Sequence, residues 1–258
     1  NEKLYFFCRT LLMLDTQRLV LVAFTMLLGS TVASTLGFGL GITVSPILLL
    51  ILSPITVVIT VNIIGAIIYG IILVRNFDHV KLREVGPLTC GGLLGVPFGV
   101  LALNSVSTSA LRISITVIIM ALVVVATTHQ VSQIKSSGIV ASPLGFIVGA
   151  MTASLGVGAP LIVLFILQHS WPPHTTRASL SLYNFLIMIA GIVGYGITGL
   201  LTTDHISLLL IVSIPVATGY VLGNHLMNRM DSKTFRKGAI GLISITSLIV
   251  LGREVLAL

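Results

Sequence analysis

The stretch Ser34-Thr-Leu-Gly-Phe-Gly-Leu-Gly-Ile-Thr-Val-Ser-Pro46 interrupts an apolar segment that covers residues 19–52. One straight helix over these 34 residues would be about 51 Å long, at about 1.5 Å per residue. The hydrocarbon core of a bilayer is only about 30 Å thick. The segment is therefore predicted to form a helix, a break and a short returning helix. The residues that mark the predicted bend are Gly37, Gly39, Gly41 and Pro46.

A second stretch, Ala153-Ser-Leu-Gly-Val-Gly-Ala-Pro160, interrupts the apolar segment 138–168 in the same way. This segment is also too long for one span, and its break is predicted at Gly156, Gly158 and Pro160. Helix-breaking sequence at membrane depth survives only where the freed backbone groups meet protein, water or a ligand. A matched pair of breaks in two halves of a chain is typical of a transporter's binding site.

Composition places the chain among polytopic α-helical membrane proteins. Hydrophobic residues make up 55% of the sequence and charged residues 8%, whereas soluble domains carry about 25% charged residues. The net charge of +7 comes from basic residues in short loops between apolar runs. That distribution is a topology signal, so a nucleic-acid partner is not expected. The sequence shows no catalytic dyad, metal cluster or nucleotide loop, and we expect neither an enzyme nor a bound cofactor.

The remaining apolar runs predict three plain helices in each half. They are expected at 55–74, 85–103 and 110–128, and again at 177–200, 206–227 and 235–252. A loop that includes Pro173 and His174 precedes the helix at 177–200. Residues 1–18 are predicted to form an N-terminal interfacial segment, because apolar residues share one helical face. The predicted domains are a first transmembrane repeat at 19–128, a linker at 129–137 and a second transmembrane repeat at 138–258.

An internal repeat supports this division. One motif occurs twice at a constant shift of 124 positions, as Gly95-x3-Gly99-x3-Leu103-Asn104-x7-Arg112 and as Gly219-x3-Gly223-x3-Met227-Asn228-x7-Arg236. The breaks also match, with Ser34, Gly37, Gly39 and Asn62 corresponding to Ser154, Gly156, Gly158 and Asn184. The glycine spacing of the motif is typical of close helix packing. Such packing occurs within a chain or between copies, so a homo-oligomer stays open.

Loop charges predict that the two repeats are inverted. Loop 75–84 has three Lys or Arg residues and its equivalent 200–205 has none, while 104–109 has none and 228–237 has four. Positive charge gathers on the cytoplasmic side, so equivalent loops lie on opposite sides. Each repeat is then a glycine-broken helical hairpin or re-entrant segment plus three transmembrane helices. Lys3, Arg9 and Arg18 do not fit this topology, which leaves open the side of the N-terminus and whether the breaks cross fully.

The residues at the breaks predict an uncharged, donor-rich pocket for a small anion. Helix N-termini offer unsatisfied N–H groups, and glycines let a ligand approach the backbone. No charged residue falls at the centre of a predicted span, which disfavours a proton relay and an arginine clamp. Three helix tyrosines, Tyr69, Tyr183 and Tyr195, could line a cavity, although a packing or interface role is more common for this residue type. The predicted substrate-binding residues are Ser34, Gly37, Gly39, Gly41, Ser45, Asn62, Ser154, Gly156, Gly158 and Asn184. The alternative is that these small residues only allow tight helix packing.

The two breaks and the duplicated glycine motif resemble the sulfite exporter TauE/SafE family over roughly residues 19–252. The resemblance implies a bacterial or archaeal inner-membrane permease for sulfur-containing or organic anions such as sulfite, sulfoacetate or related sulfonates. It also implies that the transport site lies between the two broken segments. The second break has Ala159-Pro160 where the first has Leu40-Gly41, so the half-sites need not contribute equally. An anion channel with a glycine- and serine-lined filter is the alternative function.

Overall fold

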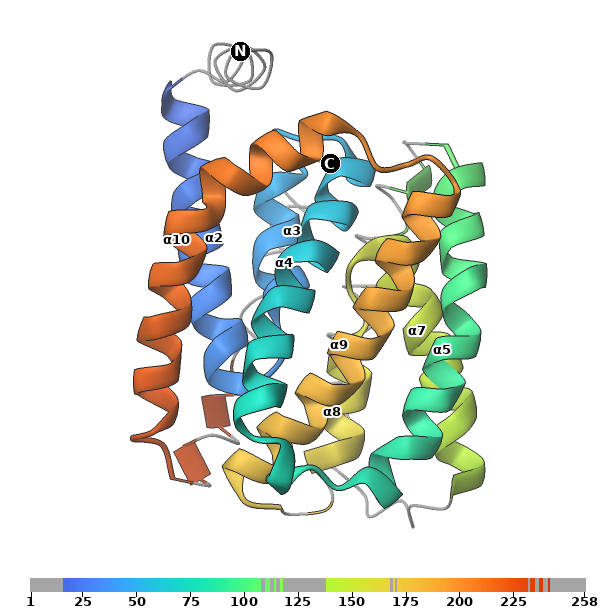
Figure 1. The fold of residues 1–258 in the computed structure, drawn as a ribbon, viewed down its shortest axis with the longest axis vertical. Helices are drawn as coiled ribbons and strands as arrows, with labels where there is room; N and C mark the ends of the chain where they lie inside the picture. Colours follow the sequence, from blue (N-terminus) through green and yellow to red (C-terminus); the bar gives the residue numbers. More distant parts are fainter. Residues whose placement is uncertain are drawn as a thin grey trace.

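The computed structural model describes residues 16–107, 110–111, 114, 117, 138–167, 169, 171–231, 233–234, 237–238 and 241. These residues form eight α-helices and one short 3-10 helix, with no strand among them (Figure 1). The predicted all-α fold is confirmed for this part of the chain. The linker 129–137 lies outside the described residues. So do residues 1–15 and most of the helices predicted at 110–128 and 235–252.

Five of the described helices are long and apolar enough to cross a bilayer. A sixth helix, α7 (Gly138–Leu155), is apolar but shorter. Large apolar side chains such as Phe24, Phe98 and Ile214 stand exposed on the outside of the bundle, where lipid would cover them. The chain is therefore a multi-pass membrane protein. The five long helices are α2 (Thr16–Leu36), α4 (Pro54–Arg75), α5 (Leu82–Ser105), α9 (Pro173–Ile197) and α10 (Thr203–Met227).

Both long apolar segments are broken as predicted, and each continues in a nine-residue helix. These helices are α3 (Leu40–Leu48) and α8 (Ala159–Leu167). At about 1.5 Å per residue each is about 14 Å long, less than half of the hydrocarbon core. The breaks are shorter than predicted, because Gly41 and Pro46 lie inside α3 and Pro160 inside α8. Pro160 is the second residue of its helix, where the missing N–H has no helical partner to lose.

Prolines also set the starts of two long helices. α4 begins at Pro54, and the Ser53 hydroxyl accepts a hydrogen bond from the Thr56 backbone N–H at 3.2 Å. α9 begins at Pro173, four residues before the predicted start. The prediction of a loop through His174 was wrong, because proline suits the first turn of a helix as well as a loop. Arg177 consequently lies one turn inside α9.

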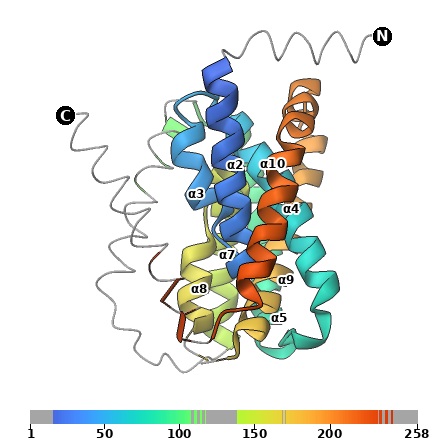
Figure 2. The ribbon, with the colours of Figure 1, turned by 90° about the vertical axis from the view of Figure 1, so that its left-hand side faces the viewer.

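The most extensive helix contacts join the first part of the chain to the second. α2 packs along α10, α5 packs along α7, and α4 packs against α9 (Figures 1 and 2). A Cβ added at Gly95 or Gly99 of α5 would overlap a carbonyl oxygen of α7, and one added at Gly223 of α10 would overlap the Thr31 carbonyl of α2. Both glycine motifs therefore allow close helix approach within the chain.

The basic segments meet at one end of the bundle, the lower end in Figure 1. The 3-10 helix η1 (Phe77–His79) contacts the start of α9, and the His79 and His174 rings lie 6.1 Å apart. The Arg75 guanidinium lies 5.8 Å from the ring centroid of Tyr220 in α10. The loop 75–84 and the residues that follow α10 therefore share this end.

Candidate functional site

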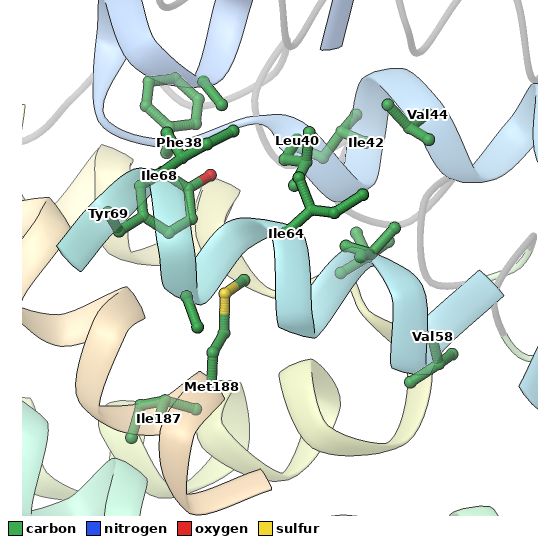
Figure 3. Close-up of a cluster of buried hydrophobic side chains, with 14 of the residues drawn as sticks. Phe38, Leu40, Ile42, Val44, Val58, Ile64, Ile68, Tyr69, Ile187 and Met188 are labelled. Atoms are coloured by element: carbon green, nitrogen blue, oxygen red, sulfur yellow. The ribbon is translucent and has the colours of Figure 1, made fainter. Parts of the chain in front are cut away.

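The first break is the three-residue turn Gly37-Phe38-Gly39 between α2 and α3. Gly37 has φ 79° and Gly39 has φ 99°, in a region that residues with a Cβ adopt only at a cost. Between them, the Phe38 side chain is fully buried. Figure 3 shows Phe38 in one cluster of buried side chains with Ile68 and Tyr69 of α4. Two glycines thus reverse the chain, and an apolar anchor holds the turn in the core.

The second break is the turn Gly156-Val157-Gly158 between α7 and α8, with Gly156 at φ 69°. It meets the other hairpin directly. A Cβ added at Gly41 of α3 would overlap the Gly156 carbonyl oxygen. The absence of a side chain at position 41 is therefore what lets the two hairpins touch. The two breaks, which are far apart in sequence, lie together in the structure.

A small cavity lies where the breaks meet. Its volume is about 10 Å³, close to the least space that one water molecule needs. Both hairpins contribute, together with α4 and α9. Five predicted site residues line it: Gly39, Gly41, Gly156, Gly158 and Asn184. The other lining residues are Ile42, Tyr69, Thr152, Val157 and Met188.

Each of the two asparagines donates a hydrogen bond to the hairpin of the other half. The Asn184 side-chain amide of α9 donates to the Gly37 carbonyl at 3.3 Å. The Asn62 amide of α4 donates to the Thr152 carbonyl of α7 at 3.3 Å, as well as to Val58 at 2.8 Å. Both side chains are buried. The two central helices, α4 and α9, are thus each hydrogen-bonded to the hairpin of the other half. Of the two asparagines, only Asn184 lines the cavity.

The three serines of the predicted site lie elsewhere. The Ser34 hydroxyl donates to the Ser30 carbonyl at 2.6 Å and reaches the Gly219 carbonyl of α10 at 3.3 Å. The Ser154 hydroxyl donates to the Ala150 carbonyl at 2.8 Å. Ser45 is buried in α3, and its hydroxyl has no partner within the described part of the chain. None of these three serines lines the cavity.

Several cavity residues are absent from the predicted substrate-binding residues. Tyr69 of α4 is buried and lines the cavity, so this tyrosine belongs to the cavity as well as to the packing. Met188 extends from α9 toward α4 (Figure 3), into space that Gly65 leaves open. Helical spacing could have indicated both, since Tyr69 follows Asn62 by two turns and Met188 follows Asn184 by one.

The helices and their paired breaks define a multi-pass helical membrane protein with a small cavity where the breaks meet. The family model described as "Sulfite exporter TauE/SafE" matches residues 21–250, nearly the whole chain. The chain belongs to this family of membrane transporters. No curated protein sequence and no solved structure matches it.

Proposed function

We propose that the protein is a secondary transporter that exports small sulfur-containing oxyanions, such as sulfite or an organosulfonate, across the inner membrane. The observation that carries the proposal is the cavity formed where the two glycine breaks meet. Membership of the TauE/SafE family supports an anion as the transported species. Backbone N–H groups at the starts of α3 and α8, and the Asn184 amide, would hold the anion through neutral donors. Neutral donors suit a substrate that must also be released.

The proposed mechanism is alternating access by two inverted halves, residues 19–128 and 138–258. Three observations support it. The helices of the first half pack mainly against those of the second, α3 and α8 are equally short, and the basic segments share one end of the bundle. In this proposal each hairpin is re-entrant, so that α3 and α8 return to the side from which α2 and α7 came. The halves then rock about a site near the midplane.

The size of the cavity indicates where the halves must separate. A space of about 10 Å³ admits about one water molecule, and an oxyanion with three oxygens is larger. Binding therefore requires the breaks to move apart at the contact between Gly41 and the Gly156 carbonyl. Closure of this contact behind the anion would separate the two sides of the membrane.

Counterflow in proteoliposomes tests the proposal. Vesicles loaded with sulfite and diluted into labelled sulfite are expected to show saturable uptake, with competition from thiosulfate or sulfoacetate and none from acetate. Absence of saturable flux for every sulfur oxyanion would reject the substrate class. Single-channel currents in planar bilayers would instead identify an anion channel.

A further inference from the structure

Arg177 is a buried cation beside the first break. It lies one turn inside α9, and only 2% of its surface is exposed. The side of Gly37 on which a side chain would stand faces this arginine, with the Arg177 carbonyl at 2.8 Å and its Cγ at 3.0 Å from the added Cβ. The turn between α2 and α3 therefore rests directly on Arg177.

Not every N–H group of the Arg177 guanidinium has a hydrogen-bond partner. Its Nη2 donates to the Asn224 side-chain oxygen of α10 at 3.1 Å, whereas its Nε is buried without a hydrogen-bond partner. Within the described residues no carboxylate forms an ion pair with it. A guanidinium has five N–H donors in a planar fork. Nη2 has one neutral acceptor and Nε has none, so no described negative charge compensates the guanidinium.

Such an arrangement is costly unless a ligand completes it. A buried charge without a counter-ion carries a desolvation penalty of several kcal/mol. Ionisable residues inside membrane proteins mark substrate or ion pathways for this reason. The missing partner is an anion, and the planar edge of the guanidinium matches two oxygens of an oxyanion.

The position of Arg177 connects it to the central cavity. Asn184 follows Arg177 by seven residues, which is two turns or about 10 Å along the same face of α9. Asn184 lines the cavity and donates to the Gly37 carbonyl, while Arg177 packs against Gly37 itself. On its other side, Arg177 is one turn from His174, at the basic end of the bundle. Along α9, Arg177 therefore lies between the basic end of the bundle and the cavity.

We infer that Arg177 is an anion-binding residue that receives the oxyanion at the Gly37 break, between the basic end of the bundle and the central cavity. The inference deepens the proposed function and rests on it for the transported species. The first half has no counterpart, because the register that pairs Asn62 with Asn184 pairs Ile55 with Arg177. Recognition of charge is thus assigned to one of the two breaks.

Three variants test the assignment by counterflow. Arg177→Gln removes the charge, Arg177→Lys keeps the charge but loses the fork, and Arg75→Gln neutralises an exposed arginine at the same end. We expect Arg177→Gln to raise the KM for sulfite about 10- to 100-fold, the range for hydrogen bonds to charged groups. Arg177→Lys should raise KM about 10-fold, and Arg75→Gln should leave it within about twofold.

A fourth variant separates anion binding from a structural role. Asn224→Ala removes the hydrogen bond between α9 and α10 but keeps the guanidinium of Arg177. We expect it to lower the thermal midpoint while KM changes less than about threefold. The inference is overturned if Asn224→Ala raises KM as much as Arg177→Gln does. It is also overturned if Arg177→Gln lowers only the maximal rate. Should Arg177→Gln fail to fold, the KM of Arg177→Lys decides.

Anion binding by purified protein distinguishes failure of this inference from failure of the proposed function. Thermal midpoints are measured in detergent with sulfite, phosphate, acetate and chloride, because binding stabilises the native state. If no sulfur oxyanion is transported, stabilisation of the wild type but not of Arg177→Lys by any of these anions still supports the role of Arg177. Equal responses of the two proteins to all four anions would refute it.

Discussion

The two breaks share a plan but differ in the groups around them. The first has two glycines at positive φ, Gly37 and Gly39, and the second has one, Gly156. The first receives the Asn184 amide within the turn itself and lies against Arg177. At the second break, the Asn62 amide reaches only the Thr152 carbonyl, four residues before the turn. The Tyr195 hydroxyl of α9 also donates to the Ala153 carbonyl, before the second turn. Within the described residues, the polar contacts from α4 and α9 therefore reach the turn itself at the first break and the end of α7 at the second.

This difference indicates how two similar halves can have different roles in binding one anion. Both breaks have a three-residue turn followed by a nine-residue helix, and a transporter needs such a hairpin on both faces of the membrane. Charge recognition needs only one residue on the route of the anion. Substitutions at matched positions distinguish the features that the two breaks share from those that belong to one of them.

The largest effect is expected where the breaks touch. Gly41→Ala would place its Cβ on the Gly156 carbonyl oxygen, a backbone atom that cannot rotate away. We expect loss of sulfite counterflow and destabilisation by about 3 kcal/mol or more, the upper range for overpacking. Gly86→Ala in α5 is the matched control, because no atom lies within 4 Å of its added Cβ. Thermal unfolding in detergent and counterflow measure both variants, and a stable, active Gly41→Ala protein would contradict the contact.

The next comparison separates backbone strain from lack of space. Gly37 and Gly156 have similar φ values, 79° and 69°. A Cβ at Gly156 finds its nearest neighbour at 3.6 Å, whereas one at Gly37 meets the Arg177 carbonyl at 2.8 Å. Gly156→Ala should therefore cost only the strain, about 1–2 kcal/mol. Gly37→Ala should cost about 1–3 kcal/mol more, from overpacking.

Asparagine provides the control for this pair, since it tolerates left-handed backbone. Gly156→Asn is expected to unfold at a higher temperature than Gly156→Ala. Gly37→Asn is expected to stay as unstable as Gly37→Ala, because its Cβ meets the same atoms. Equal thermal midpoints for Gly37→Ala and Gly156→Ala would mean that Arg177 can shift to accommodate a Cβ at position 37.

Much of this arrangement could be predicted from sequence because it depends on lengths and spacings. The length of segment 19–52 requires a break, and Gly37 and Gly39 lie in it. The exact limits were missed at Gly41 and Pro46, since both residue types also occur inside short helices. Arg177 was missed for a different reason. Its burial follows from where α9 begins and from Gly37, which is 140 positions away in the sequence. No local pattern contains such a contact.

The asparagines are expected to differ in transport although they match in sequence. Asn184→Ala removes an amide from the cavity and should raise the KM for sulfite up to about 10-fold, the effect of one neutral hydrogen bond. Asn62→Ala should leave KM within about twofold and lower stability instead, because the buried Thr152 carbonyl loses a donor. Counterflow and thermal unfolding of both variants give the two values. A similar rise of KM in both variants would show that both amides meet the anion, as their paired positions in the sequence predict.

The smallest effects are expected at the matched serines. The Ser34 hydroxyl reaches the Gly219 carbonyl and so links α2 to α10, whereas the Ser154 hydroxyl bonds only within α7. Ser34→Ala should therefore destabilise the protein by about 1 kcal/mol, and Ser154→Ala by less than about 0.5 kcal/mol. Neither should change the KM for sulfite, because neither serine lines the cavity. A raised KM in Ser154→Ala alone would mean that the second break turns its hydroxyl toward the anion when the hairpins separate. The polar groups would then be shared more evenly between the breaks than the closed cavity indicates.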